Sequence, residues 1–87
     1  MPEISRFYGI IIAMFAKDHF PPHFHALYGE FKGIFEIESG ELIEGSLPGR
    51  AVRLVQDWAE IHRNELLENW KESLKDNPEF KKIDPLK

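Results

Sequence analysis

Three of the four histidines, His19, His23 and His25, fall within seven positions of one another. Residues two apart on a β-strand share a face, so His23 and His25 are expected to project together while Phe24 points the other way. His19 precedes the pair Pro21-Pro22 and can fold back toward them. The sequence therefore predicts a cluster of imidazoles at one rim of a sheet.

Such a cluster supports three kinds of role. Imidazole nitrogens of His19, His23 and His25 can hold zinc or another divalent metal, with a fourth position left open. His23 and His25 can instead act as catalytic acid and base on a phosphodiester, as in a small ribonuclease. Alternatively, the segment is a rigid entry to a strand whose imidazoles bond to the backbone or to a partner. The spacing leaves these alternatives open.

A second group of candidates is cationic. Arg50 and Arg53 fall in the first turns of an expected helix, where the helix dipole favours anions. Arg53 can form a surface pair with Asp57, four residues on. Otherwise the two guanidinium groups form an anion site, which Arg6 can extend and whose natural ligand is the phosphate of RNA or DNA. We include Tyr28 among these candidate ligand-binding residues.

The amino-acid composition limits which partners the protein can bind and which chemistry its side chains can perform. The 87 residues have a net charge of −4 and no cysteine, so thiolate sites and disulfides are excluded. The negative charge argues against capture of nucleic acid over the whole surface, although a local basic patch stays possible. Residues 36–44 carry four glutamates and no basic residue, which suits a solvated edge or a basic protein partner.

His62 lies on the apolar stripe of the expected helix, between Trp58 and Leu66. A lone histidine in such a position is usually a core residue with satisfied hydrogen bonds. It can also meet the strand histidines if this face packs over them, and the sequence leaves the choice open.

The apolar and turn residues predict where the elements lie. Residues 7–16 form an apolar run that is too short to span a membrane and is typical of a strand covered on both faces. A helical period begins at Pro48, with Ser46 as the expected N-cap and a bend expected near 62–64. The predicted elements are strands at about 5–17, 23–29, 31–38 and 41–45, a helix at about 48–76 and a tail at 78–87.

These elements predict a single α+β domain over residues 1–87. We expect a three- or four-stranded antiparallel sheet in meander order, with one long C-terminal helix packed on one face. Because one helix cannot cover two faces of a sheet, we expect a homodimer or a cognate small protein to cover the other. With no signal peptide and no membrane span, the expected compartment is the cytoplasm.

Several motifs together are familiar. They are Ile4 to Ile10, the segment Asp18-His19 with Pro21-Pro22-His23-Phe24-His25-Ala26, Tyr28-Gly29-Glu30, and later Leu47-Pro48, Arg50-Ala51, Trp58-Ala59 and Asn69-Trp70. Over nearly the whole chain the sequence resembles the bacterial family called domain of unknown function 4160. The resemblance implies a small cytoplasmic protein that is often encoded beside another small protein, as in a toxin–antitoxin pair. It therefore implies an interaction module that binds a partner protein or nucleic acid. The resemblance implies no catalytic residues, and Gly49 departs from the basic residue expected before Arg50.

Overall fold

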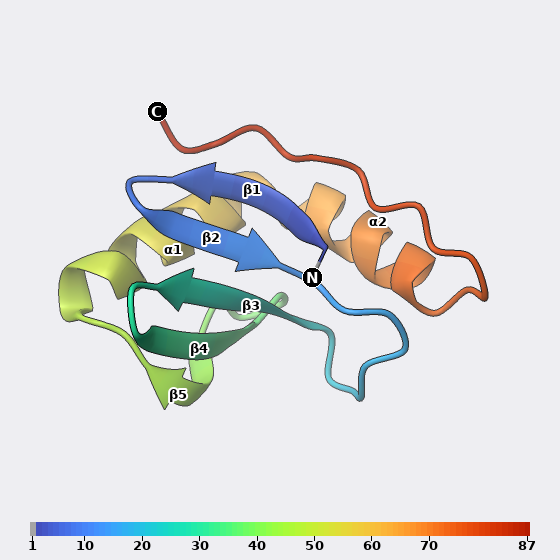
Figure 1. Ribbon diagram of the computed structural model, residues 1–87, viewed down its shortest axis with the longest axis horizontal. Helices are drawn as coiled ribbons and strands as arrows, with labels where there is room; N and C mark the ends of the chain where they lie inside the picture. Colours follow the sequence, from blue (N-terminus) through green and yellow to red (C-terminus); the bar gives the residue numbers. More distant parts are fainter. Residues whose placement is uncertain (1) are drawn as a thin grey trace.

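The computed structural model describes residues 2–87 and shows an α+β fold in which two helices lie against one face of a sheet (Figure 1). The sheet has five antiparallel strands in the order β1-β2-β3-β4-β5. The elements are β1 Glu3–Phe7, β2 Ile10–Ala13, β3 His23–Tyr28, β4 Phe31–Glu36, β5 Leu42–Ser46, α1 Gly49–Ile61 and α2 Arg63–Ser73. The predicted meander is confirmed, but with five strands and two helices.

The prediction of one strand over residues 5–17 is wrong. The chain turns at Tyr8 and Gly9, whose φ angles of 47° and 80° are both positive, and β1 pairs with β2 as a hairpin. Glycine adopts such angles without steric cost, which makes Gly9 the residue that permits the turn. Apolar residues continue through the turn on both sides, so hydropathy alone shows no break there.

The single long helix is also wrong, and the bend expected near 62–64 is where the break occurs. His62 has a φ of −109° and a ψ of 23°, and it ends α1 and precedes α2. The second helix ends at Ser73, earlier than predicted. Ser46 is not the N-cap, because it belongs to β5 and Pro48 takes that position without a side-chain hydrogen bond.

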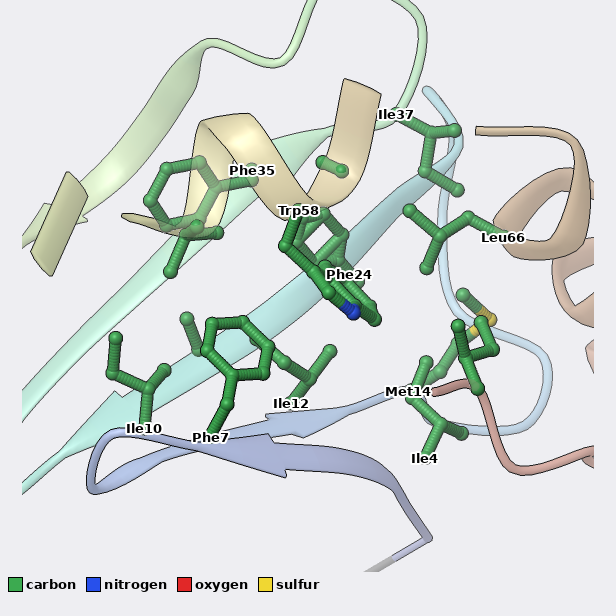
Figure 2. Packing of buried hydrophobic residues seen from close by; sticks show 14 of the residues in the cluster. Ile4, Phe7, Ile10, Ile12, Met14, Phe24, Phe35, Ile37, Trp58 and Leu66 are labelled. Carbon is green, nitrogen blue, oxygen red and sulfur yellow. The ribbon is translucent and has the colours of Figure 1, made fainter. Parts of the chain in front are cut away.

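The core lies between the sheet and the helices and is built around Trp58 of α1 (Figure 2). The Trp58 ring meets Phe7 at 5.4 Å and Phe24 at 5.8 Å between ring centroids. Phe24 in turn stacks on Phe35 of the neighbouring strand. Burial of three large aromatic rings from three strands fixes which face of the sheet turns toward the helices.

The tail runs along the outer edge of β1, as Figure 1 shows. The backbone N–H of Ile83 donates to the carbonyl oxygen of Ile4, and the indole N–H of Trp58 donates to the carbonyl oxygen of Asp84. Asn69 binds both backbone groups of Lys81. These bonds attach the tail to β1 and to α1. Within residues 2–87, neither helix is long and apolar enough to cross a membrane.

Candidate functional site

The candidate site lies at the start of β3, where the segment between β2 and β3 folds back over the sheet. His23 and His25 are two residues apart and point to the face opposite Phe24, as strand alternation predicts. Asp18 approaches both rings from that segment. The backbone N–H of Lys17 donates to the carbonyl oxygen of Ser73, which ties the segment to the end of α2.

One carboxylate oxygen joins the two histidines. Asp18 Oδ2 lies 2.9 Å from His23 Nε2 and 3.2 Å from His25 Nε2. His23 is 1% exposed, whereas about a fifth of the side chains of Asp18 and His25 remains exposed. The cluster therefore has a buried side, made by His23, and a side open to solvent.

The hydrogen bonds of His23 fix where its protons lie. Nδ1 of His23 is 2.7 Å from the carbonyl oxygen of Pro21, and a carbonyl can only accept, so Nδ1 carries a hydrogen. The lone pair of a neutral ring then sits on Nε2, facing the carboxylate of Asp18 at 2.9 Å. Two acceptors do not attract at that distance. A hydrogen or a metal ion between the two atoms turns this close approach into an attraction.

The carboxyl group of Asp18 is held in its charged form. Partial burial acts to raise its pKa, but hydrogen bonds from His25, from the backbone N–H of His19 and from His23 outweigh this effect. The pKa of Asp18 is therefore below its ordinary value. A carboxylate that stays ionised is ready to pair with a cation at this site.

His19 joins the cluster only at its margin. Its ring lies 5.1 Å from that of His23 between centroids, but its side chain is 76% exposed. Its Nδ1 is 3.3 Å from the carbonyl oxygen of Phe20. The potential metal-binding group among the described residues consists of Asp18, His23 and His25, whose ligand atoms all lie within 4.8 Å of one another. The prediction named His19 as the third ligand, and the structure places Asp18 there.

Aromatic rings pack around the imidazoles. The edge of Phe15 meets His25 with 4.6 Å between ring centroids, and Trp70 of α2 lies 5.2 Å from His23. The indole nitrogen of Trp70 is buried and has no hydrogen-bond partner in the described chain. These rings lower the polarity around the cluster and restrict the motion of the imidazoles.

The arginine candidates lie elsewhere. Arg50 lines a pocket of about 400 Å³ with Tyr8, Tyr28 and Leu54, at the end of β3 opposite to His23. Tyr28 follows His23 by five residues, which corresponds to roughly 17 Å along a strand. Arg50 and Tyr28 thus share one pocket, as a ligand-binding pair would, but they do not approach the histidines.

Arg6 and Arg53 do not line this pocket. Arg6 pairs with Glu3 on β1, at 2.8 Å. The Arg53 side chain lies beside Gly49. Residues 2–87 contain no ion pair between Arg53 and Asp57. Of the three predicted arginines, only Arg50 lines this pocket, and Arg6 is paired with Glu3 instead.

His62 does not join the strand histidines. Its Nδ1 lies 2.6 Å from a carboxylate oxygen of Glu65, and its ring packs at 5.6 Å from that of Trp58. It sits at the junction of α1 and α2, so its role there is structural.

Asp18 is the site residue that our sequence reasoning missed. Its carboxylate is five positions before His23, in a segment with no periodic pattern, so neither strand nor helix spacing relates the two. Histidines that are close together in a folded protein usually have a carboxylate or carbonyl partner. A search for acidic residues near the histidines would therefore have identified Asp18.

The chain was also compared with known proteins. No curated protein and no solved structure matches it. A family model described as a domain of unknown function, DUF4160, matches residues 9–71, which include both strand histidines, Asp18 and most of the two helices. The match covers well over half of the sequence and agrees with the resemblance drawn from its motifs. The chain therefore belongs to the DUF4160 family.

Proposed function

We propose that the protein binds a divalent transition-metal ion, zinc first among them, through Asp18, His23 and His25. The observation that carries this proposal is the convergence of Asp18 Oδ2 with the Nε2 atoms of both histidines. Two imidazoles and one carboxylate are a donor set of catalytic zinc sites, where the fourth position holds water or substrate.

The separations of the donor atoms fit one ion. Zinc–nitrogen and zinc–oxygen bonds of about 2.0–2.2 Å place two ligands of a tetrahedral ion about 3.3 Å apart. Asp18 Oδ2 already lies 2.9 Å and 3.2 Å from the two nitrogens. All three ligand atoms lie within 4.8 Å of one another, so movement of the side chains alone would bring the two imidazoles around one ion. The fold already brings these three ligands together.

The surroundings favour the metal as well. The Pro21 carbonyl holds the hydrogen of His23 on Nδ1 and directs the lone pair of Nε2 at the site, which is the usual second contact of a metal-bound histidine. The exposed side of the cluster gives a ligand access, and His19 is near enough to approach from that side. A bound zinc ion there would supply a Lewis acid for polarising water or an anionic substrate.

Two further functions stay predictions from the sequence. Ribonuclease chemistry needs a cationic group beside the acid and base to stabilise the developing charge. Arg50 lies at the opposite end of β3, and Arg6 is paired with Glu3, so neither of these arginines supports that role. The toxin–antitoxin role follows only from the family resemblance.

The test is isothermal titration of the metal-free protein with zinc at neutral pH. The wild-type chain should bind one zinc ion, and His25→Ala and Asp18→Asn should each weaken binding by at least a hundredfold. His25 is the better variant because it is partly exposed and its loss leaves the core intact. Absence of zinc binding by the wild type would overturn the proposal.

The matched control is His62→Ala. His62 is a partly buried histidine with a carboxylate partner, Glu65, but it is no part of the cluster. The His62→Ala variant should keep the wild-type affinity for zinc. Equal losses in His62→Ala and His25→Ala would mean that zinc binds without this geometry and would count against the site. His19→Ala reports separately whether the exposed ring is a fourth ligand, through a smaller loss of about tenfold.

A further inference from the structure

The pocket of about 400 Å³ beside Arg50 lies at the end of β3 opposite to His23, between the start of α1 and two hairpin turns. Figure 1 shows the β1–β2 turn, the β3–β4 turn and the start of α1 at the same end of the molecule. Ile10 and Ala51, which are buried, form its apolar floor. A hollow of this volume is within the range of small-molecule sites.

Two tyrosine rings line this pocket and stay accessible. Tyr8 lies in the β1–β2 turn and is 58% exposed, and Tyr28 ends β3 and is 36% exposed. The Tyr28 ring packs beside Gly9, where an added Cβ would lie 3.4 Å from a ring carbon. The turn therefore holds this ring in place. Accessible aromatic faces above an apolar floor suit a planar ring in the ligand.

The start of α1 supplies positive charge. Arg50 is the charged residue among those that line the pocket. Arg53 lies close to the same turn, since a Cβ at Gly49 would be 3.7 Å from a guanidinium nitrogen of Arg53. Neither arginine takes part in an ion pair within residues 2–87. The first turn of α1 contains no acidic residue, so nothing there offsets two cations at the positive end of the helix dipole.

We propose that this pocket binds a small molecule in which a planar ring is joined to a phosphate, such as a nucleoside monophosphate. The phosphate pairs with Arg50 and accepts from N–H groups in the first turn of α1, which no side chain caps. The ring packs on Tyr8 and Tyr28 over the apolar floor. The ligand neutralises the cations that the fold leaves unpaired.

The surroundings favour a single nucleotide over a nucleic-acid strand. The volume of the pocket suits one ring and one phosphate. The chain has a net charge of −4, and residues 36–44 carry four glutamates beside the strand that leads into α1. These carboxylates repel a polyanion that extends from the pocket along β4 and β5. The proposal does not depend on metal binding, because the histidines lie at the other end of β3.

Titration of the nitrogen-15-labelled chain with adenosine monophosphate, followed by NMR with a chelator present, tests the proposal. We expect saturable binding with a dissociation constant of about 10–100 µM. Shifts should be largest at Gly49, Arg50, Ala51 and the two hairpin turns, and His25 should not shift. Adenosine and inorganic phosphate should each bind at least tenfold more weakly. Absence of binding, shifts centred elsewhere, or either part binding as tightly as the whole nucleotide would overturn the proposal.

Substitutions separate the two parts of the ligand. Arg50→Gln should weaken binding of the nucleotide at least tenfold and leave binding of adenosine unchanged. Tyr8→Asn should weaken both, and asparagine tolerates the positive φ of this position. Arg63→Gln is the matched control, because Arg63 is an exposed arginine at the first residue of α2, and it should have no effect.

Equal losses in Arg50→Gln and Arg63→Gln would show attraction by overall charge alone and would overturn the proposal. Nucleotide binding that is unchanged in Tyr8→Asn would contradict packing of the ligand ring on Tyr8. Circular dichroism and thermal melting confirm that each variant is folded before its affinity is compared with that of the wild type.

Discussion

The Nδ1–H of His23 donates to the carbonyl oxygen of Pro21, two residues earlier, at 2.7 Å. This bond determines how the other ring nitrogen behaves, because Nε2 is left to face Asp18 with a lone pair or with a second proton. With zinc bound, we expect the lone pair of Nε2 to be shared with the metal while Nδ1 keeps its hydrogen.

Nitrogen NMR of the histidine rings checks this expectation. On addition of zinc, Nε2 of His23 should move to a metal-bound chemical shift, while Nδ1 should keep its proton. The rings of His19 and His62 provide internal references. A chemical shift of His23 Nε2 that zinc leaves unchanged would contradict the assignment of Nε2 as a ligand atom.

Trp70 should report metal binding by its fluorescence. Its ring lies 5.2 Å from that of His23, and copper or nickel at this range quenches an excited indole efficiently. One equivalent of copper should quench the wild-type emission strongly. In Trp70→Phe, the remaining emission comes from Trp58 in the core and should be nearly insensitive to copper. Equal quenching in both proteins would place the metal elsewhere.

The stability of the metal-free protein should depend on Asp18 at low pH. The pKa of this carboxyl is lowered in the folded state, from an ordinary value of 3.8, by hydrogen bonds that outweigh the effect of burial. A depressed carboxyl pKa stabilises the fold above the ordinary value, and this contribution is lost as the pH falls through the folded value. Urea unfolding at several pH values with a chelator should show that Asp18→Asn removes this part of the pH dependence.

Gly45 should tolerate substitution far less well than Gly40. Both have positive φ, 80° and 76°, so alanine is strained at either position. A Cβ at Gly45 would collide with the carbonyl oxygen of Lys32, whereas one at Gly40 would meet nothing within 4 Å. We expect Gly40→Ala to cost about 1–2 kcal/mol and Gly45→Ala more than about 3 kcal/mol. Similar losses in denaturant unfolding would argue against the close approach of β5 to β4.

Asn69 should hold the tail in place. Its buried side-chain amide donates to the carbonyl oxygen of Lys81 and accepts from the Lys81 backbone N–H. Asn69→Ala should cost about 2 kcal/mol and should raise hydrogen exchange in residues 79–87 more than in β3. Ser73→Ala, also buried on α2, is the control because its hydroxyl binds Trp70 and not the tail. If hydrogen exchange in residues 79–87 is no faster in Asn69→Ala than in the wild type, the backbone bond of Ile83 holds the tail instead.

The alternation of side chains between the two faces of a strand predicted much of the sheet and of the site. This pattern depends only on residues that are adjacent in the sequence, so it can be read directly from them. It placed His23 and His25 together and Phe24 on the other face, and the turn residues predicted the hairpin at Gly29. It failed at Tyr8, because an apolar residue with positive φ has no signature in composition. Asp18 was missed because its approach to the histidines depends on the path of an irregular loop.

The pairing of Ile83 with Ile4 also affects how the chain folds during synthesis. These residues are about 80 positions apart, so the outer edge of β1 gains its cover only after nearly all of the described chain has been made. At about 5–20 residues per second, β1 waits roughly 4–16 s on the ribosome with its edge unpaired. Contacts of such long range form slowly, and an open strand edge can pair with other chains. The nascent chain is therefore most vulnerable to aggregation before the segment around Ile83 emerges.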